Sequence, residues 1–385
     1  MSENIKKMIG ETFKDIAKAI ETGSFAAGIR VGITTLGSEH GVENLVAGAE
    51  MAAKESAGFE IVLIGPKVDT ELEVAEVATE EEAHKKMEEL LDSGYLSACV
   101  TMHYNFPIGV STVGRVITPG KGKEMFIATT TGTSAAHRVE AMVKNAIYGI
   151  ITAKAMGKKN PTVGILNLDG ARAVERALKE LDKNGYPITF AESMRADGGC
   201  VMRGNDLLGA AADVMVTDTL TGNIMMKVFS SYTTGGSYEG LGYGYGPGIG
   251  EGYDRTVLIL SRASGTPVAA NAIKYAAKLS AGNVKKIAAE EFKKAKAAGL
   301  EDILSALTAT KKEAVEEEVK MPEKEVVTAS IAGIDVMDLE DAQKALWKAG
   351  IYAETGMGCT GPMVQMSEAN LEASKKILAD AGYIA

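Results

Sequence analysis

The sequence predicts an α/β protein with a Rossmann-like, three-layer α/β/α arrangement around a mostly parallel sheet, followed by a small α/β module. Short, continuously apolar, β-rich runs alternate with helical patterns over most of the chain, which is typical of a parallel sheet covered on both faces. The 385 residues exceed the usual size of one domain, so a large unit with a smaller one is expected. A change of composition after residue 280 separates the two units.

The elements of the large unit follow in order. Charged and apolar residues mix over 1–20, which predicts an amphipathic helix rather than a signal peptide, and hence a cytoplasmic protein. A helical pattern covers 42–56, between the first two strands. Strands are expected at 29–35, 60–65, 97–102, 125–129, 162–167, 188–192, 213–218 and 255–260. Right-handed crossovers between them would place ligands beyond the carboxyl ends of the strands.

Three parts are expected along the chain: an α/β domain over 1–280, a charged helical linker over 281–325 and a small module over 326–385. The linker is inferred from a lysine-, alanine- and glutamate-rich composition that ends in a charged run with almost no apolar face. The module should contain a helix over 338–350 and a last helix that Cys359 opens.

Charge and cysteine content exclude several classes of function. A net charge of −10 repels the phosphate backbone of nucleic acids, and no basic stripe interleaved with aromatic residues offsets it. No segment approaches the roughly 18 consecutive apolar residues of a membrane span. The cysteines, Cys99, Cys200 and Cys359, are odd in number and lack CxxC spacing, so we expect no disulfide framework, no metal site and at least one free thiol.

The run DVMVTDTLTGNIMMK holds the first candidate site. It places Asp218 at a strand end and Thr219, Thr221, Gly222 and Asn223 in the turn that enters a helix. Backbone N–H groups and small side chains at such a turn can bind an anion, and Lys227 could add a cation nearby. The alternative is that Asp218 and Thr221 cap the helix. The spacing alone does not decide between the two.

The run ATTTGTSAAHR holds the second candidate. A strand ends there in hydroxyl groups and a glycine, at Thr130, Thr131, Gly132, Thr133 and Ser134, before a helix begins. These residues could cradle a phosphate by the same logic. An ordinary strand-to-helix loop with a threonine or serine N-cap is the alternative.

Cys359 has the most suggestive setting of the thiols. Glycines at 356, 358 and 361 allow close approach of the backbone, and Pro362 suits the first turn of a helix. A helix N-terminus stabilises a thiolate and lowers the cysteine pKa, which makes the sulfur a nucleophile. The alternative is a small residue packed in a tight turn.

The other titratable candidates lie at strand ends or in loops. Cys99 lies in an apolar strand and is expected to be buried. His103 follows at the end of that strand and is the preferred acid or base of the large unit, with a satisfied core histidine as the alternative. Cys200 lies in a loop beside Arg203, which could bind an acidic substrate or be exposed.

A glycine- and tyrosine-rich segment spans 235–252. It is longer than usual connections, and we interpret it as a flexible lid or a surface insertion. Its GxGxxG-like spacing does not join a strand directly to a helix, so dinucleotide binding is rejected.

Residues 28–280 resemble the phosphate acyltransferase family of phospholipid synthesis. The resemblance lies in IRVGITTLGSEHGVENLVAGAEMA, NPTVGILNLDG, GTPVAANAIKYAA and, most specifically, ADVMVTDTLTGNIMMK. It implies a Rossmann-like fold, transfer of an acyl group to phosphate, and an active-site role for Asp218, Thr221, Gly222 and Asn223.

Over its full length, including TGMGCTGP, the chain resembles the protein C alpha subunits of the glycine, sarcosine and betaine reductase complexes. This resemblance implies that Cys359 carries an acetyl group as a thioester, which inorganic phosphate, as substrate, releases as acetyl phosphate without a cofactor. It also implies an oligomer whose partners are the protein C beta subunit, selenoprotein A and the substrate-specific protein B.

Two alternatives remain beside this implied function. The large unit could make long-chain acyl phosphate as an acyl-carrier-dependent phosphate acyltransferase, or the chain could be a catalytically silent scaffold. The implied reaction would also require the C-terminal module to dock near the strand ends, so that Cys359 reaches the phosphate site.

Overall fold

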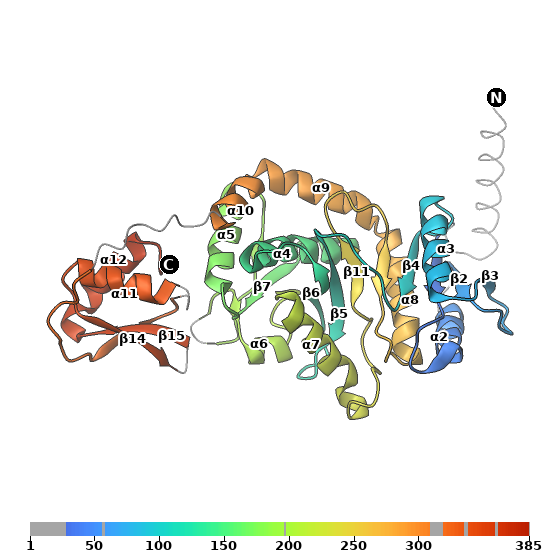
Figure 1. The fold of residues 1–385 in the computed structure, drawn as a ribbon, viewed down its shortest axis with the longest axis horizontal. Helices are drawn as coiled ribbons and strands as arrows, with labels where there is room; N and C mark the ends of the chain where they lie inside the picture. The colour runs from blue at the N-terminus through green and yellow to red at the C-terminus, as the bar shows by residue number, and fades with distance from the viewer. Residues whose placement is uncertain are drawn as a thin grey trace.

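The computed structural model describes residues 28–55, 58–195, 198–308, 319–334, 338–358 and 361–384. These residues form a large α/β unit and a smaller unit, drawn in red beside it in Figure 1. The predicted fold class is confirmed. None of the helices in these ranges combines the length and apolarity that crossing a membrane requires.

A single 12-stranded sheet forms the middle of the large unit. The predicted strands are all present, and four others are additional: β3 (Glu73–Glu76), β5 (Val110–Ile117), β9 (Val201–Met202) and β11 (Gly246–Ile249). The order across the sheet is β3 (Glu73–Glu76), β2 (Glu60–Gly65), β1 (Arg30–Thr34), β4 (Ala98–Thr101), β12 (Val257–Ile259), β11 (Gly246–Ile249), β5 (Val110–Ile117), β6 (Glu124–Thr133), β10 (Val214–Val216), β7 (Thr162–Leu166) and β8 (Thr189–Phe190), with β9 (Val201–Met202) also beside β7.

The sheet consists of two parallel halves that run in opposite directions. Strand β11 is antiparallel to both β12 and β5, and β5 is antiparallel to β6. The strands β1, β2, β4 and β12 therefore end at one edge, which we call the His103 edge. The strands β6, β7, β9 and β10 end at the opposite edge, which we call the Asp218 edge. The carboxyl ends of the parallel strands therefore lie at two opposite edges of the sheet.

Helices cover both faces of the sheet. One apolar core packs against α2 (Gly41–Glu55), α4 (Arg138–Ala155), α5 (Ala171–Lys183), α8 (Thr266–Ala281), α9 (Val284–Ala297) and α10 (Leu300–Thr308). The second core, on the other face, packs against α3 (Glu80–Asp92), α6 (Gly204–Leu208) and α7 (Thr219–Ser231), which is followed by the short helix η1 (Tyr232–Thr234). The two cores produce the predicted three layers.

The end of the glycine-rich segment 235–252 belongs to the sheet, and whether the rest acts as a lid stays a prediction. Its residues 246–249 form β11, which is buried along its whole length. A Cβ on Gly246 would lie 1.7 Å from the Val113 carbonyl oxygen, and one on Gly248 would lie 2.4 Å from the Phe106 ring. The glycines therefore allow close packing in the middle of the sheet. Glycine occurs both in flexible loops and where two backbones pack closely, so composition alone does not distinguish these two cases.

Part of the predicted linker belongs to the large unit. Residues 281–308 are helical as expected, but α9 and α10 bury Phe292, Leu300 and Ile303 in the core that α4 and α5 share. These apolar positions lie among many lysines and glutamates, which obscure the amphipathic pattern. Residues 309–318 lie outside the described part of the chain.

The small unit is an antiparallel sheet with helices on it and a core of its own. It contains β13 (Ala329–Ala332), α11 (Leu339–Lys348), β14 (Ala353–Gly358), β15 (Gly361–Met366), η3 (Glu368–Asn370) and α12 (Leu371–Asp380), with strand order β13-β15-β14. Val364 and Met366 alternate inward along β15. Strands therefore flank Cys359, where a helix was expected to begin, and the last helix begins at Leu371.

Candidate active site

The turn between β10 and α7 is a helix cap at the Asp218 edge. Asp218 is the N-cap, and its Oδ1 accepts a hydrogen bond from the Thr221 N–H at 2.8 Å. Its Oδ2 accepts from Arg138 Nη2 at 2.7 Å. The capping alternative for Asp218 is therefore what the structure shows, because the carboxylate serves the cap and an ion pair.

The two predicted sites lie against each other. Thr219 Oγ1 donates to the Gly132 carbonyl at 3.2 Å, and Asn223 Nδ2 donates to the Thr130 carbonyl at 3.0 Å. A Cβ on Gly222 would lie 1.7 Å from the Thr129 carbonyl oxygen. Glycine is thus required for α7 to approach β6 this closely. Segments some ninety residues apart in the sequence meet here. The second site is not a loop after a strand, as predicted, because β6 continues to Thr133 and includes Thr130 to Thr133.

Several members of the predicted phosphate cradle have internal partners. Thr130 is buried and donates to the Tyr245 carbonyl at 2.8 Å. Ser134 is buried and donates to Asn145 Oδ1 at 2.6 Å. Thr131 and Gly132 are half-buried and Thr133 is exposed. The roles of these residues as phosphate ligands stay a prediction.

His103 lies far from this turn. It is exposed and follows β4 at the His103 edge, where its carbonyl accepts from Thr101 Oγ1 at 3.4 Å. Strands β12, β11 and β5 separate β4 from β6, a width of about 19 Å at the usual strand spacing. The structure therefore does not bring His103 to Asp218.

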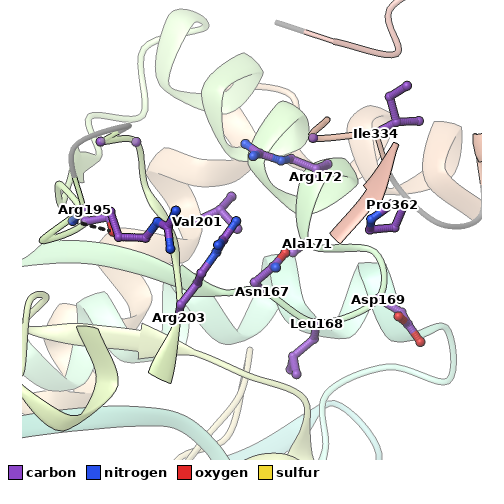
Figure 2. Close-up of a pocket in the computed structure, with 14 residues that line it drawn as sticks. Asn167, Leu168, Asp169, Ala171, Arg172, Arg195, Val201, Arg203, Ile334 and Pro362 are labelled. Atoms are coloured by element: carbon purple, nitrogen blue, oxygen red, sulfur yellow. Dashed lines mark hydrogen bonds between the residues drawn. The ribbon is translucent and has the colours of Figure 1, made fainter. Parts of the chain in front are cut away.

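A cavity of about 140 Å³ lies at the Asp218 edge, between the large unit and the small one. We call it the junction pocket, and its side chains are drawn in Figure 2. The large unit contributes the turn between β7 and α5, the segment before β9, and the end of β9. The small unit contributes Gly333, Ile334 and Pro362. The described part of the module thus docks next to a strand end, as the implied reaction requires.

Three arginines line the junction pocket. Arg172 comes from the first turn of α5, Arg195 from the segment before β9, and Arg203 from the end of β9. Figure 2 shows all three directed to the same side of the pocket, opposite Asp169. Except for Arg203, noted for its loop position, this group is not apparent from the sequence because its members come from separate segments.

One arginine connects the junction pocket with the α7 turn. Arg138 Nη1 lies 3.5 Å from Asp169 Oδ2, and its Nη2 lies 2.7 Å from Asp218 Oδ2. Asp169 lines the junction pocket and Asp218 caps α7. The pocket and the predicted turn are therefore adjacent parts of one polar region.

A buried carboxylate fixes the wall of the pocket. Asp206 is fully buried and accepts from Ser193 Oγ at 2.9 Å, from the Met194 N–H at 2.7 Å and from the Arg203 N–H at 2.8 Å. These bonds hold the backbone around Arg195 and Arg203. A buried carboxylate is stable only with such donors.

Cys359 lies outside the described residues, as does Thr360. The strands on either side are described: β14 ends at Gly358, which pairs with Gly361 at the start of β15. Pro362 lines the junction pocket. Since strands and not a helix flank Cys359, the prediction that a helix N-terminus lowers its pKa is wrong.

The other two thiols are unsuited to nucleophilic catalysis. Cys99 and Cys200 are free and buried. Burial raises the pKa of Cys99 above its usual range. Burial, with the nearby Glu175 carboxylate, raises the pKa of Cys200 to about 12. Both remain neutral thiols near neutral pH, and the thiolate is the reactive form.

A second polar cluster lies at the His103 edge and is not apparent from the sequence. Glu239 is buried, and its carboxylate lies 3.3 Å from Lys227 Nζ and 3.4 Å from Ser264 Oγ. Lys227 is therefore not the expected cation beside Asp218. It lies further along α7, about 13 Å from the cap at the usual helical rise. Across the described ranges, no group of three or more metal-ligating side chains is arranged to hold an ion.

Comparison with known proteins gives matches over long stretches of the chain. The family model described as fatty acid synthesis protein matches residues 29–365. The glycine/sarcosine/betaine reductase complex component C subunit alpha of Peptoclostridium acidaminophilum is 81% identical over 383 residues, which cover 99% of this chain and 100% of that protein. A phosphate acyltransferase of Fervidobacterium nodosum is 30% identical over 157 residues, 39% of this chain and 45% of that protein.

Among solved structures, the chain is similar to a branched-chain phosphotransacylase from Enterococcus faecalis V583. The TM-score is 0.44 and the sequence identity 18%, over 65% of this chain and 99% of that chain.

Proposed function

Because the chain belongs to the fatty acid synthesis protein family and, within it, to the component C alpha subunits of glycine/sarcosine/betaine reductase, we propose that it is an acetyl-transfer subunit. Cys359 carries the acetyl group as a thioester, and inorganic phosphate removes it as acetyl phosphate. The chain acts in a reductase complex with a protein C beta subunit, selenoprotein A and a substrate-specific protein B.

The position of the small unit carries this proposal. Its strands β14 and β15 flank Cys359, and Pro362 lines a pocket at the Asp218 edge. Cys99 and Cys200 are buried with raised pKa values, so Cys359 is the thiol that remains for catalysis. The turn at Asp218, which carries the resemblance to phosphate acyltransferases, is at the same edge.

The transfer step is a simple acyl exchange. An oxygen of inorganic phosphate attacks the carbonyl carbon of the Cys359 thioester, and a C–O bond forms. The C–S bond then breaks with its electron pair, so that the sulfur leaves as a thiolate. No oxidant or reductant enters this step. Cationic and N–H donors near the carbonyl would stabilise the negative charge that develops on its oxygen.

The reverse reaction provides the test. The full-length chain is incubated with acetyl phosphate, quenched in acid and mapped by mass spectrometry. We expect a hydroxylamine-sensitive acetyl adduct on the peptide with Cys359, and none on the peptides with Cys99 or Cys200, which serve as internal controls. The Cys359→Ala chain should give no adduct. Absence of the adduct on Cys359 at every phosphate concentration would favour a silent scaffold.

A second candidate is transfer of long acyl chains to phosphate by the large unit alone. The similarity to the Fervidobacterium nodosum phosphate acyltransferase, over 39% of this chain, favours it. The two candidates differ in their need for the thiol. A Cys359→Ala chain that forms acyl phosphate at the full rate would support this second candidate and exclude the first.

A further inference from the structure

We propose that the junction pocket is an oxyanion-binding site and that, resting on the proposed function, it takes the phosphate group of inorganic phosphate and of acetyl phosphate. This assigns phosphate to the arginines at the junction rather than to the hydroxyl groups at Thr130 and Ser134, which have internal partners.

Positive charge predominates in the lining of the pocket. Among the described lining residues, the basic ones are Arg172, Arg195 and Arg203 and the acidic one is Asp169, although the chain as a whole has a net charge of −10. Arg172 also pairs with Glu175, which does not line the pocket, and Asp169 pairs with Arg138. Guanidinium groups present planar pairs of N–H donors that match the oxygens of phosphate. A concentration of positive charge in an acidic protein, around a cavity, suits a small anion.

The N-terminus of α5 adds to the positive electrostatic potential in the pocket. Ala171 and Arg172 of its first turn line the pocket, and Gly170, which precedes them, offers no side-chain cap. The first turn itself contains no acidic residue, and Asp169, which precedes Gly170, pairs with Arg138. Arg172 adds a further positive charge there. A bound anion is stabilised by both the arginine and the dipole.

The volume of the pocket suits a small anion better than a large organic ligand. Its volume is about 140 Å³, whereas a water molecule needs roughly 10–15 Å³ by the same measure. The space therefore accommodates a phosphate together with an acetyl group. Larger organic ligands occupy pockets of about 300 Å³ and more.

The Arg172 guanidinium and the backbone that carries Arg203 are held in position before any ligand binds. Arg172 Nη1 donates to Glu175 Oε2 at 2.8 Å, and that carboxylate is 9% exposed. Asp206, fully buried, holds the backbone at Met194 and Arg203. A site whose donors are already placed binds without a large loss of conformational entropy.

Titration of inorganic phosphate into the full-length chain tests the site, followed by calorimetry or by 31P NMR line width. We expect Arg203→Gln and Arg172→Gln each to weaken phosphate binding at least tenfold, and Arg203→Lys, which keeps the charge but not the planar fork, to weaken it less. The matched control is Arg30→Gln, because Arg30 pairs with Glu60 on β1 away from the pocket. It should leave the affinity unchanged.

Two results would overturn the proposal. One is phosphate affinity that neither Arg172→Gln nor Arg203→Gln changes, in chains with unaltered circular dichroism and thermal midpoint. The other is affinity lost only in Arg262→Gln, since Arg262 pairs with Glu80 at the His103 edge. Acetyl phosphate is titrated in parallel and should follow the same pattern.

The same measurement in Cys359→Ala separates this inference from the proposed function. Phosphate binding that persists there and depends on the arginines supports the pocket, whether or not an acetyl adduct forms on Cys359. An adduct on Cys359 together with arginine-independent phosphate binding supports the thioester and rejects the pocket.

Discussion

Burial and a neighbouring carboxylate both raise the pKa of the Cys200 thiol. Its Sγ lies 3.4 Å from Glu175 Oε1 inside the core, and its pKa rises to about 12. Cys99 is fully buried and its pKa is also raised. We therefore expect a thiol reagent such as DTNB at pH 8 to titrate one cysteine in the native chain and three in denaturant, with Cys359→Ala abolishing the native reaction. Rapid labelling of Cys99 or Cys200 in the native chain would contradict this.

The same shift predicts how stability depends on pH. The folded state holds the Cys200 proton more tightly than the unfolded state, where a thiol ionises near its usual pKa of about 8.5. The neutral Cys200 thiol therefore contributes its full share of the folding free energy below about pH 8.5. That contribution is lost as the pH rises from about 8.5 towards about 12. Urea unfolding of Cys200→Ser and wild type at pH 8 and 10 measures it. We expect the wild type to lose more stability between these values, and an equal loss would refute the assignment.

Single residues also show how much of the site the sequence can predict. The pattern alone places Asp218 correctly at a strand end, whereas Thr130 lies within β6, which continues to Thr133. The structure brings the two segments together. His103 is also predicted at a strand end, but a strand pattern carries no direction. Only the pairing through β11 and β5 shows that β4 runs opposite to β6. Arg172 and Arg195 do not stand out, because nothing in the sequence links separate loops around one cavity.

At the scale of the element, the packing of α7 on β6 depends on Gly222. A methyl group there would lie 1.7 Å from the Thr129 carbonyl oxygen, so Gly222→Ala must push α7 away from the sheet. We expect the free energy of unfolding in urea to fall by about 2 kcal/mol or more.

A second glycine provides the control for this prediction. A methyl group on Gly204, in α6, would have no other atom within 4 Å, and Gly204→Ala should change stability by less than about 1 kcal/mol. Equal effects of the two substitutions would show that the contact between α7 and β6 tolerates a side chain.

Elements with a clear apolar period, such as β1 and β2, are predicted with nearly their observed bounds. Strand β11 is not, because its GPGI sequence has few side chains to form a pattern, and its place in the sheet depends on contacts with Val113 and Phe106. Strand β15 is mistaken for the start of a helix, since TGMGCTGP resembles a helix entry. Its inward positions, Val364 and Met366, have the period of a strand.

At the scale of the whole molecule, the two units have separate cores. The core of the small unit contains Ile331, Leu346 and Val364 and, among the described residues, includes none of the large one. The junction contains cavities and the partly exposed ion pair between Arg176 and Asp338, with side-chain exposures of 47% and 24%. Such a pair contributes roughly 1 kcal/mol or less.

A chain ending at Thr308 tests this separation. We expect it to keep its circular dichroism and to unfold cooperatively within about 4 °C of the main transition of the full-length chain, because both large cores remain intact. It should lose the acetyl adduct, which the proposed function assigns to Cys359, and bind phosphate more weakly, because Ile334 and Pro362 no longer line the pocket. A truncated chain that fails to fold would show that the small unit stabilises the large one.

The reversal at β11 has a consequence for transport within the protein. The eight residues of β5 run from one edge of the sheet to the other, a length of about 26 Å. An acetyl group on a side chain cannot bridge that length. Cargo loaded at the His103 edge would reach the junction pocket only by diffusing through solvent or by travelling with the small unit as a whole. A thioester on a fixed side chain therefore serves only the edge at which it was loaded.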